Sequence, residues 1–124
     1  MHKTQRDPLT EKIIACCFAV HNELGPGFPE RIYHNAIKIA IKENGLKFES
    51  EKEFEVHFKG RNIGKFRCDL VVKDKVIVEI KSVTDKIPVL FHYQLLSYLK
   101  ASKIKTGLLV NFGNKSCEIK RLSY

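Results

Sequence analysis

The spacing of hydrophobic residues changes part-way along this chain, and the change limits the folds that the chain can adopt. In the first third, apolar residues recur at helical spacing, as in Ile13, Cys17 and Val20. From about Phe54 onward, apolar residues alternate with polar or charged ones, which is typical of strands. The predicted order is helix, helix, three strands, helix and two strands, so we expect a single α/β domain over residues 1–124.

The boundaries of the first two helices follow from capping residues. Asp7 and Pro8 are typical of an N-cap and a first helical position, and the glycines of residues 25–27 end this helix. The second helix is expected to begin near residues 29–30 and to end at the Asn-Gly pair of residues 44–45.

The remaining elements are separated by short turns. We expect strands over residues 54–58, 63–72, 76–81, 107–112 and 117–122, and a third helix over residues 88–101. The first three strands would form a meander, and the third helix would then carry the chain across to the last two strands.

Composition narrows the classes of partner and compartment. The formal net charge is +8, from 22 Lys and Arg against 14 Asp and Glu, which suits a nucleic-acid partner but also a solvated basic surface. Four cysteines without C-x-x-C spacing argue against a zinc or disulfide framework and indicate a reducing compartment, so we expect a cytoplasmic location. The longest apolar stretch, residues 13–20, is far shorter than the roughly 20 residues that span a bilayer, so no membrane association is expected.

Two acids and a lysine stand on strands that are expected to be neighbours. If the turn at residues 73–75 has three residues, Asp69 lies opposite Glu79, and both share one face with Lys81. A two-residue turn would send Asp69 to the other face. Glu79 could simply belong to the polar side of a strand, but residues 76–80 are otherwise apolar, and a buried unpaired charge is very costly. Two carboxylates there could hold a divalent cation, and the ammonium could steady a developing oxyanion.

Other polar residues could extend this site. Gln94 and Tyr98 lie at i and i+4 and therefore on one face of the third helix, where a Gln amide could bond a water, a phosphate or a carboxylate. An exposed Gln and a Tyr at the edge of the core are the alternative. Glu30, three residues before Tyr33, could face the site, or its charge could only interact favourably with the helix dipole. The Glu-Ile-Lys tripeptide recurs at residues 118–120 without an acid just before it, so the tripeptide alone is weak evidence.

Several motifs occur together in a specific order. They are G-x-x-E-x-x-Y at residues 27–33, Asp69, Glu-Ile-Lys at residues 79–81, Gln94-x-x-x-Tyr98, and GLLVNFG at residues 107–113. From about residue 13 to residue 121, this pattern resembles the GxxExxY family, small prokaryotic proteins of the PD-(D/E)XK nuclease superfamily. The resemblance implies a restriction-endonuclease-like αβββαβ core, a mixed central sheet flanked by helices, with an extra N-terminal helix and a C-terminal strand.

The same resemblance implies roles for the residues on the middle hairpin. Asp69 and Glu79 would bind Mg²⁺ or Mn²⁺, with the carbonyl of Ile80 as an additional ligand. Lys81 would position or help to deprotonate the attacking water. One departure from the superfamily pattern is Cys68, which stands where a proline often precedes the acid.

Residues on the helices would complete this site. By resemblance, Gln94 would act in catalysis as part of the Q-x-x-x-Y element of exonuclease-like branches, supported by Tyr98. Glu30 matches a helical acid that joins the metal site directly or through water in some branches, and Tyr33 would support it.

The expected function is metal-dependent hydrolysis of phosphodiester bonds by a nuclease, in DNA rather than RNA. Basic residues expected around the acidic edge are candidates for contacts with the nucleic-acid backbone: Lys65, Arg67, Lys73, Lys75 and Lys86. A homo-oligomer or a partner protein could supply specificity. The alternative is a non-catalytic nucleic-acid-binding or regulatory module on the same fold, in which Glu79 would form a structural ion pair with Lys81 or Arg67.

Overall fold

A computed structural model describes residues 7–124. The elements are α1 (Pro8–Leu24), α2 (Glu30–Glu43), β1 (Phe48–Phe58), β2 (Arg61–Val72), β3 (Val76–Lys81), α3 (Val89–Ser102), β4 (Thr106–Asn111) and β5 (Glu118–Ser123). This confirms the predicted element order. The first strand begins earlier than expected, because its initial residues also alternate between half-buried and exposed positions.

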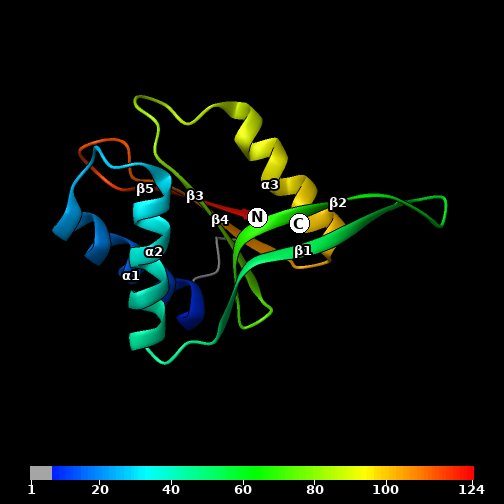
Figure 1. The fold of residues 1–124 in the computed structure, drawn as a ribbon, viewed down its shortest axis with the longest axis horizontal. Helices are drawn as coiled ribbons and strands as arrows, with labels where there is room; N and C mark the ends of the chain where they lie inside the picture. Colours follow the sequence, from blue (N-terminus) through cyan, green and yellow to red (C-terminus); the bar gives the residue numbers. More distant parts are fainter. Residues whose placement is uncertain (1–6) are drawn as a thin grey trace, which may run out of the picture.

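The five strands form one mixed sheet in the order β1-β2-β3-β4-β5 (Figure 1). All neighbours are antiparallel except β3 and β4, which are parallel and are joined through α3. A parallel pair needs such a crossover, whereas the antiparallel pairs are joined by short turns or loops.

Helices cover both faces of the sheet. One core cluster joins α1 and α2 to the sheet and includes Ile37 and Val78, and a second joins α3 to the opposite face and includes Leu99 and Ile77. Strand β3 contributes alternate residues to the two clusters and is therefore buried on both faces. No helix within residues 7–124 is long and apolar enough to cross a membrane.

The predicted helix boundaries are confirmed by their caps. The side chain of Asp7 accepts a hydrogen bond of 2.8 Å from the backbone N–H of Thr10, and α1 ends at Gly25, whose φ is 69°. In the first turn of α2, Tyr33 is buried, whereas Ile32 is 41 % exposed. The four cysteines carry free thiols.

The ribbon formed by β1 and β2 reverses its inner face at Asp69. Leu70 packs in the cluster under α1 and α2, whereas Cys68 packs in the cluster under α3, although residues two apart on a regular strand point to the same side. Opposite Asp69, the ladder lacks a pair, and Glu51 has a φ of 53°, in the left-handed region. Beyond this point the ribbon follows α3 and then extends past it (Figure 1).

Candidate active site

The register of the β2–β3 hairpin brings the two acids together. Strand β2 pairs with β3 through Val72–Val76, Val71–Ile77 and Leu70–Val78, which leaves a three-residue turn between them. Continuing this register by one residue places Asp69 opposite Glu79. The predicted register is therefore confirmed.

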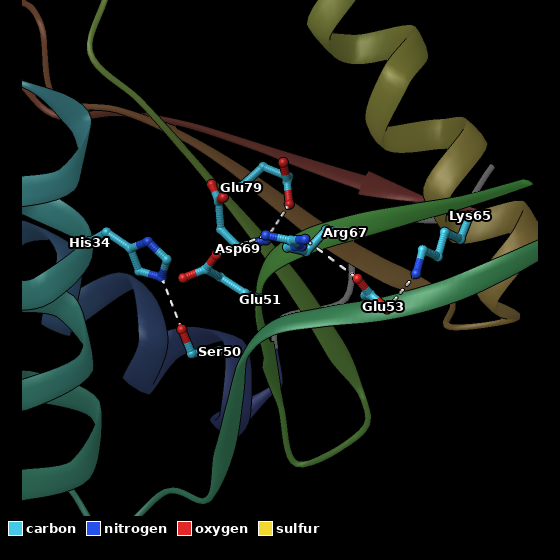
Figure 2. Close-up of polar contacts among 8 residues, drawn as sticks. All are labelled: His34, Ser50, Glu51, Glu53, Lys65, Arg67, Asp69 and Glu79. Atoms are coloured by element: carbon cyan, nitrogen blue, oxygen red, sulfur yellow. Dashed lines mark hydrogen bonds and ion pairs between the residues drawn. The ribbon is translucent and has the colours of Figure 1, made fainter.

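Beyond the Leu70–Val78 pair, the side chains of Asp69 and Glu79 make the hydrogen bonds between β2 and β3 that backbone groups make in the rest of the ladder. Oε2 of Glu79 accepts from the backbone N–H of Asp69 at 2.8 Å (Figure 2). Oδ2 of Asp69 accepts from the N–H of Ile80 at 2.7 Å. Each carboxylate is thus oriented through one oxygen. Among residues 7–124 no donor bonds the second oxygens, Oδ1 of Asp69 and Oε1 of Glu79, so both can bind a ligand.

Burial of Glu79 opposes full ionisation of the acid pair. Glu79 is 5 % exposed, and its burial, together with the charge of Asp69, raises its pKa to about 8. The bond from the backbone of Asp69 and the charge of Lys81 lower this pKa, but they do not offset the burial. The site therefore retains a proton near neutral pH unless another positive charge enters it.

Lys81 supplies one positive charge beside the acids. Its ammonium lies 4.2 Å from the centre of the Phe91 ring, a cation–π contact with the first turn of α3. The charge of Lys81 lowers the pKa of both Glu79 and Glu30, so it acts on the acids from both sides of the site.

Helix α3 approaches the acids from one side. The Tyr98 ring stacks on Phe66 with centroids 4.3 Å apart, and burial raises the pKa of Tyr98, assisted by the charge of Glu79. Gln94 lies one turn earlier on α3 and is half-buried.

Helix α2 approaches from the other side. Glu30 is its first residue, and desolvation of its carboxyl together with the charge of Asp69 raises its pKa against the opposing effect of Lys81. Tyr33 is fully buried: its hydroxyl donates to the carbonyl of Gly25 at 2.5 Å and accepts from the N–H of Phe28 at 3.2 Å. The tyrosine of the G-x-x-E-x-x-Y motif therefore holds the turn that precedes the glutamate.

A hollow of about 300 Å³ opens over Asp69. It is lined by Glu30, Arg31, His34, Glu51, Arg67, Asp69 and Ile80. Three of these residues were not predicted to line the site: Arg31, His34 and Glu51. Figure 2 shows His34 and Glu51. His34 follows Glu30 by one helical turn, which is a usable sequence signal. Nothing in the sequence indicates that Glu51 lines the site, because its position depends on the reversal of the ribbon.

Comparison with known proteins identifies the family. A family model described as the PD-(D/E)XK nuclease superfamily matches residues 7–122. The chain belongs to this superfamily. It is also similar to a solved structure titled "Crystal structure of SSO0001", with 26 % identity and a TM-score of 0.61 over 75 % of this chain and 48 % of that one. This chain therefore spans about half the length of that protein. No curated protein matches the sequence.

The superfamily implies a nucleic-acid substrate and, in general, divalent metals such as Mg²⁺. Residues 7–124 contain no group of three or more His, Cys, Asp or Glu side chains that could hold a metal ion. Mg²⁺, however, is commonly bound by one or two carboxylates together with waters and substrate phosphates. The oxygens of Asp69 and Glu79 that no protein donor bonds, and the Ile80 carbonyl, are hard donors of that kind, so the residues present fit the ion.

The basic candidates for nucleic-acid contacts of this PD-(D/E)XK chain are not all near the acids. Arg67 pairs with Glu51 at 3.3 Å and with Glu53 at 3.4 Å, and Lys65 pairs with Glu53 at 3.3 Å (Figure 2). Lys86 is exposed in the connection that follows β3. The remaining two, Lys73 and Lys75, lie in the turn before β3, at the opposite end of that strand from Glu79, so the structure does not bring them to the acid pair.

A polar network holds the chain that follows Lys81. Asn111 is fully buried; its Oδ1 accepts from the N–H of Val83 at 2.9 Å, and its Nδ2 donates to the Val83 carbonyl at 2.9 Å. Glu118, from the repeated tripeptide, accepts from Asn111 at 3.1 Å and from Asn114 at 3.0 Å. The repeated glutamate therefore supports this loop and does not face a second acid.

Proposed function

We propose that this protein is a metal-dependent nuclease that hydrolyses phosphodiester bonds, in DNA in preference to RNA, and that it belongs to the GxxExxY branch of its superfamily. The observation that carries the proposal is the pair formed by the buried Glu79 and the half-buried Asp69, which lies at the open end of a strand ladder beside Lys81. Membership of a nuclease superfamily supports the reaction class, and the net charge of +8 supports a polyanionic substrate.

Asp69, Glu79 and the carbonyl of Ile80 would hold Mg²⁺ or Mn²⁺. The bound ion would polarise the scissile phosphate and lower the pKa of a bound water. The ammonium of Lys81 would stabilise negative charge that develops on the phosphate, and its contact with Phe91 supports this role because it restricts the position of the ammonium.

Residues on the two flanking helices would assist. The amide of Gln94 would bond the water or a phosphate oxygen, and Tyr98 would support that face of α3. Glu30 would bind the ion through a water or accept a proton, a role that suits its raised pKa.

Cleavage assays test this proposal. Purified protein would be incubated with single-stranded DNA, double-stranded DNA and RNA in Mg²⁺ or Mn²⁺, beside Asp69→Ala and Lys81→Ala. We expect each substitution to reduce the cleavage rate by about 100-fold or more, since each removes a group that acts on the transition state. The matched control is Lys120→Ala, which removes the exposed lysine of the repeated tripeptide and should leave the rate unchanged.

Two results would contradict a nuclease. Cleavage that persists in both variants would indicate a contaminant, and salt-sensitive binding without cleavage in any metal would favour the non-catalytic module. That module would pair Glu79 with Lys81 or Arg67. In the described part of the chain Glu79 has neither partner, since Arg67 pairs with Glu51 and Glu53.

A further inference from the structure

The outer part of the β1–β2 hairpin extends beyond the helices that cover the sheet (Figure 1). We name residues 57–65 the arm, and every residue in it is exposed. Phe58 is 61 % exposed and Ile63 is 63 % exposed. An uncovered hairpin with exposed apolar residues is a typical site of contact with another molecule. The arm is therefore a candidate contact surface.

The charges of the arm indicate a polyanionic partner. Its sequence, HFKGRNIGK, contains Lys59, Arg61 and Lys65 and no acid. Lys65 is paired with Glu53, but within residues 7–124 no carboxylate pairs with Lys59 or Arg61. The ammonium of Lys59 instead lies 5.5 Å from the centre of the Phe58 ring, so a cation and an exposed aromatic ring are presented together.

Helix α3 adds positive charge beside the base of the arm. A hollow of about 490 Å³ lies between them and is lined by Glu55, Val56, His57, Ser97, Lys100, Ala101 and Lys103. Lys100 and Lys103 are both exposed. The hollow therefore has two lysines on its α3 side and one acid, Glu55, which pairs with His57 on the arm side, and the lysines suit contacts with a phosphodiester backbone.

The dimensions of the arm match duplex DNA. A two-stranded β-ribbon fits the major groove, which is about 12 Å wide. Ile63 lies six positions before Asp69 on β2, which corresponds to roughly 20 Å, or about six base pairs along the duplex. A bulge between Val56 and His57 increases the twist of the ribbon just before its tip.

We propose that the arm binds in a groove of duplex DNA about six base pairs from the phosphate at the acid pair. Lys59 and Arg61 contact phosphates, and Phe58 and Ile63 contact sugars and base edges. This inference rests on the proposed nuclease function. It adds that the substrate is duplex DNA and that the arm is the surface that selects it.

Binding and cleavage by arm variants test the proposal. Affinity for a 20-base-pair duplex would be measured by fluorescence anisotropy in EDTA at several salt concentrations, for the wild type, Lys59→Ala/Arg61→Ala and Phe58→Ala/Ile63→Ala. The charge-matched control is Lys12→Ala/Lys42→Ala, which removes two exposed lysines of α1 and α2. All these positions are exposed, and circular dichroism would verify that each variant folds.

We expect the Lys59→Ala/Arg61→Ala variant to lose roughly tenfold in affinity per phosphate contact at 0.1 M salt, and to lower the slope of log K against log salt by about 2. The apolar variant should lose affinity without a change of slope, and the control should bind as the wild type does. In Mg²⁺ or Mn²⁺, the arm variants should raise KM more than they lower kcat.

Other outcomes overturn the inference. If the arm variants bind and cleave as the wild type does, or lose no more affinity than the control, the arm is not a DNA contact, while the nuclease proposal stands. A change only in the oligomeric state would make the arm a contact between copies, and selective loss of RNA or single-strand binding would replace the duplex. If the wild type neither binds nor cleaves DNA, both proposals fail.

Discussion

Replacing Glu79 with glutamine should stabilise the metal-free protein at high pH. Gln keeps an oxygen that can accept from the backbone of Asp69 but has no charge to bury. In the folded protein the pKa of Glu79 is raised from 4.5 to about 8, first by burial and then by the charge of Asp69. That shift sets an upper limit of about 5 kcal/mol on the cost of ionising Glu79 in the folded protein.

The sign follows from proton linkage. Between pH 4.5 and about 8 the folded state binds more protons than the unfolded chain, so the free energy of unfolding of the wild type decreases as pH rises through this window. Below pH 4.5 the group is protonated in both states, and above pH 8 it is ionised in both. Glu79→Gln lacks this decrease, so its stability relative to the wild type should increase between pH 5 and pH 9, by at most about 4 kcal/mol.

Urea unfolding followed by circular dichroism at pH 5, 7 and 9 in EDTA measures this difference. Any unpaired amide in the variant adds a constant cost, so the change with pH is the informative quantity. The control is Glu55→Gln, whose side chain is 63 % exposed in the wild type. A stability difference that stays constant from pH 5 to pH 9 would refute the reasoning. Mn²⁺ at ten times its Kd should then stabilise the wild type by about 1.4 kcal/mol and the Glu79→Gln variant by less.

Three further substitutions test the supporting structure. Tyr33→Phe removes the hydroxyl that donates to the carbonyl of Gly25, so urea unfolding should show a loss of about 1–2 kcal/mol; an unchanged midpoint would contradict its role in the turn. Gly113→Ala would place a Cβ 2.1 Å from the carbonyl oxygen of Val83, so thermal unfolding should show a loss of about 3 kcal/mol or more, and wild-type stability would disprove the close approach. Glu51→Gly removes the left-handed strain of a residue with a side chain, and we expect a gain of up to about 1 kcal/mol in urea; a clear loss would show that the side chain matters more than the strain.

Much of the fold and the centre of the site could be predicted from local signals. The capping residues set the helix boundaries, and the three-residue turn at residues 73–75 set the register that pairs Asp69 with Glu79. The surroundings of Glu79 were also predictable, because a single acid inside an apolar strand must lie in the core.

The parts that could not be predicted depend on the path of the ribbon. The reversal at Asp69 coincides with the positive φ of Glu51, and a glutamate in the sequence does not predict a positive φ. The reversal turns Arg67 toward acids of β1. Lys73 and Lys75 were expected around the acidic edge because they are close to the acids in sequence. They lie in the turn, however, and each residue along a strand takes the chain about 3.3 Å further from that turn, so the acids lie at a distance from them.

The two Glu-Ile-Lys tripeptides show why context decides the chemistry. Glu118 begins the edge strand β5, where two asparagine amides donate to its carboxylate and its charge is satisfied within the protein. Glu79 lies in a strand buried on both faces and opposite a second acid, so its charge is opposed by the fold. Two carboxylates that each lack a donor for one oxygen cost stability in the free protein, and a bound cation would offset this cost. The same three residues are therefore structural on the edge strand and suited to metal chemistry in the centre of the sheet.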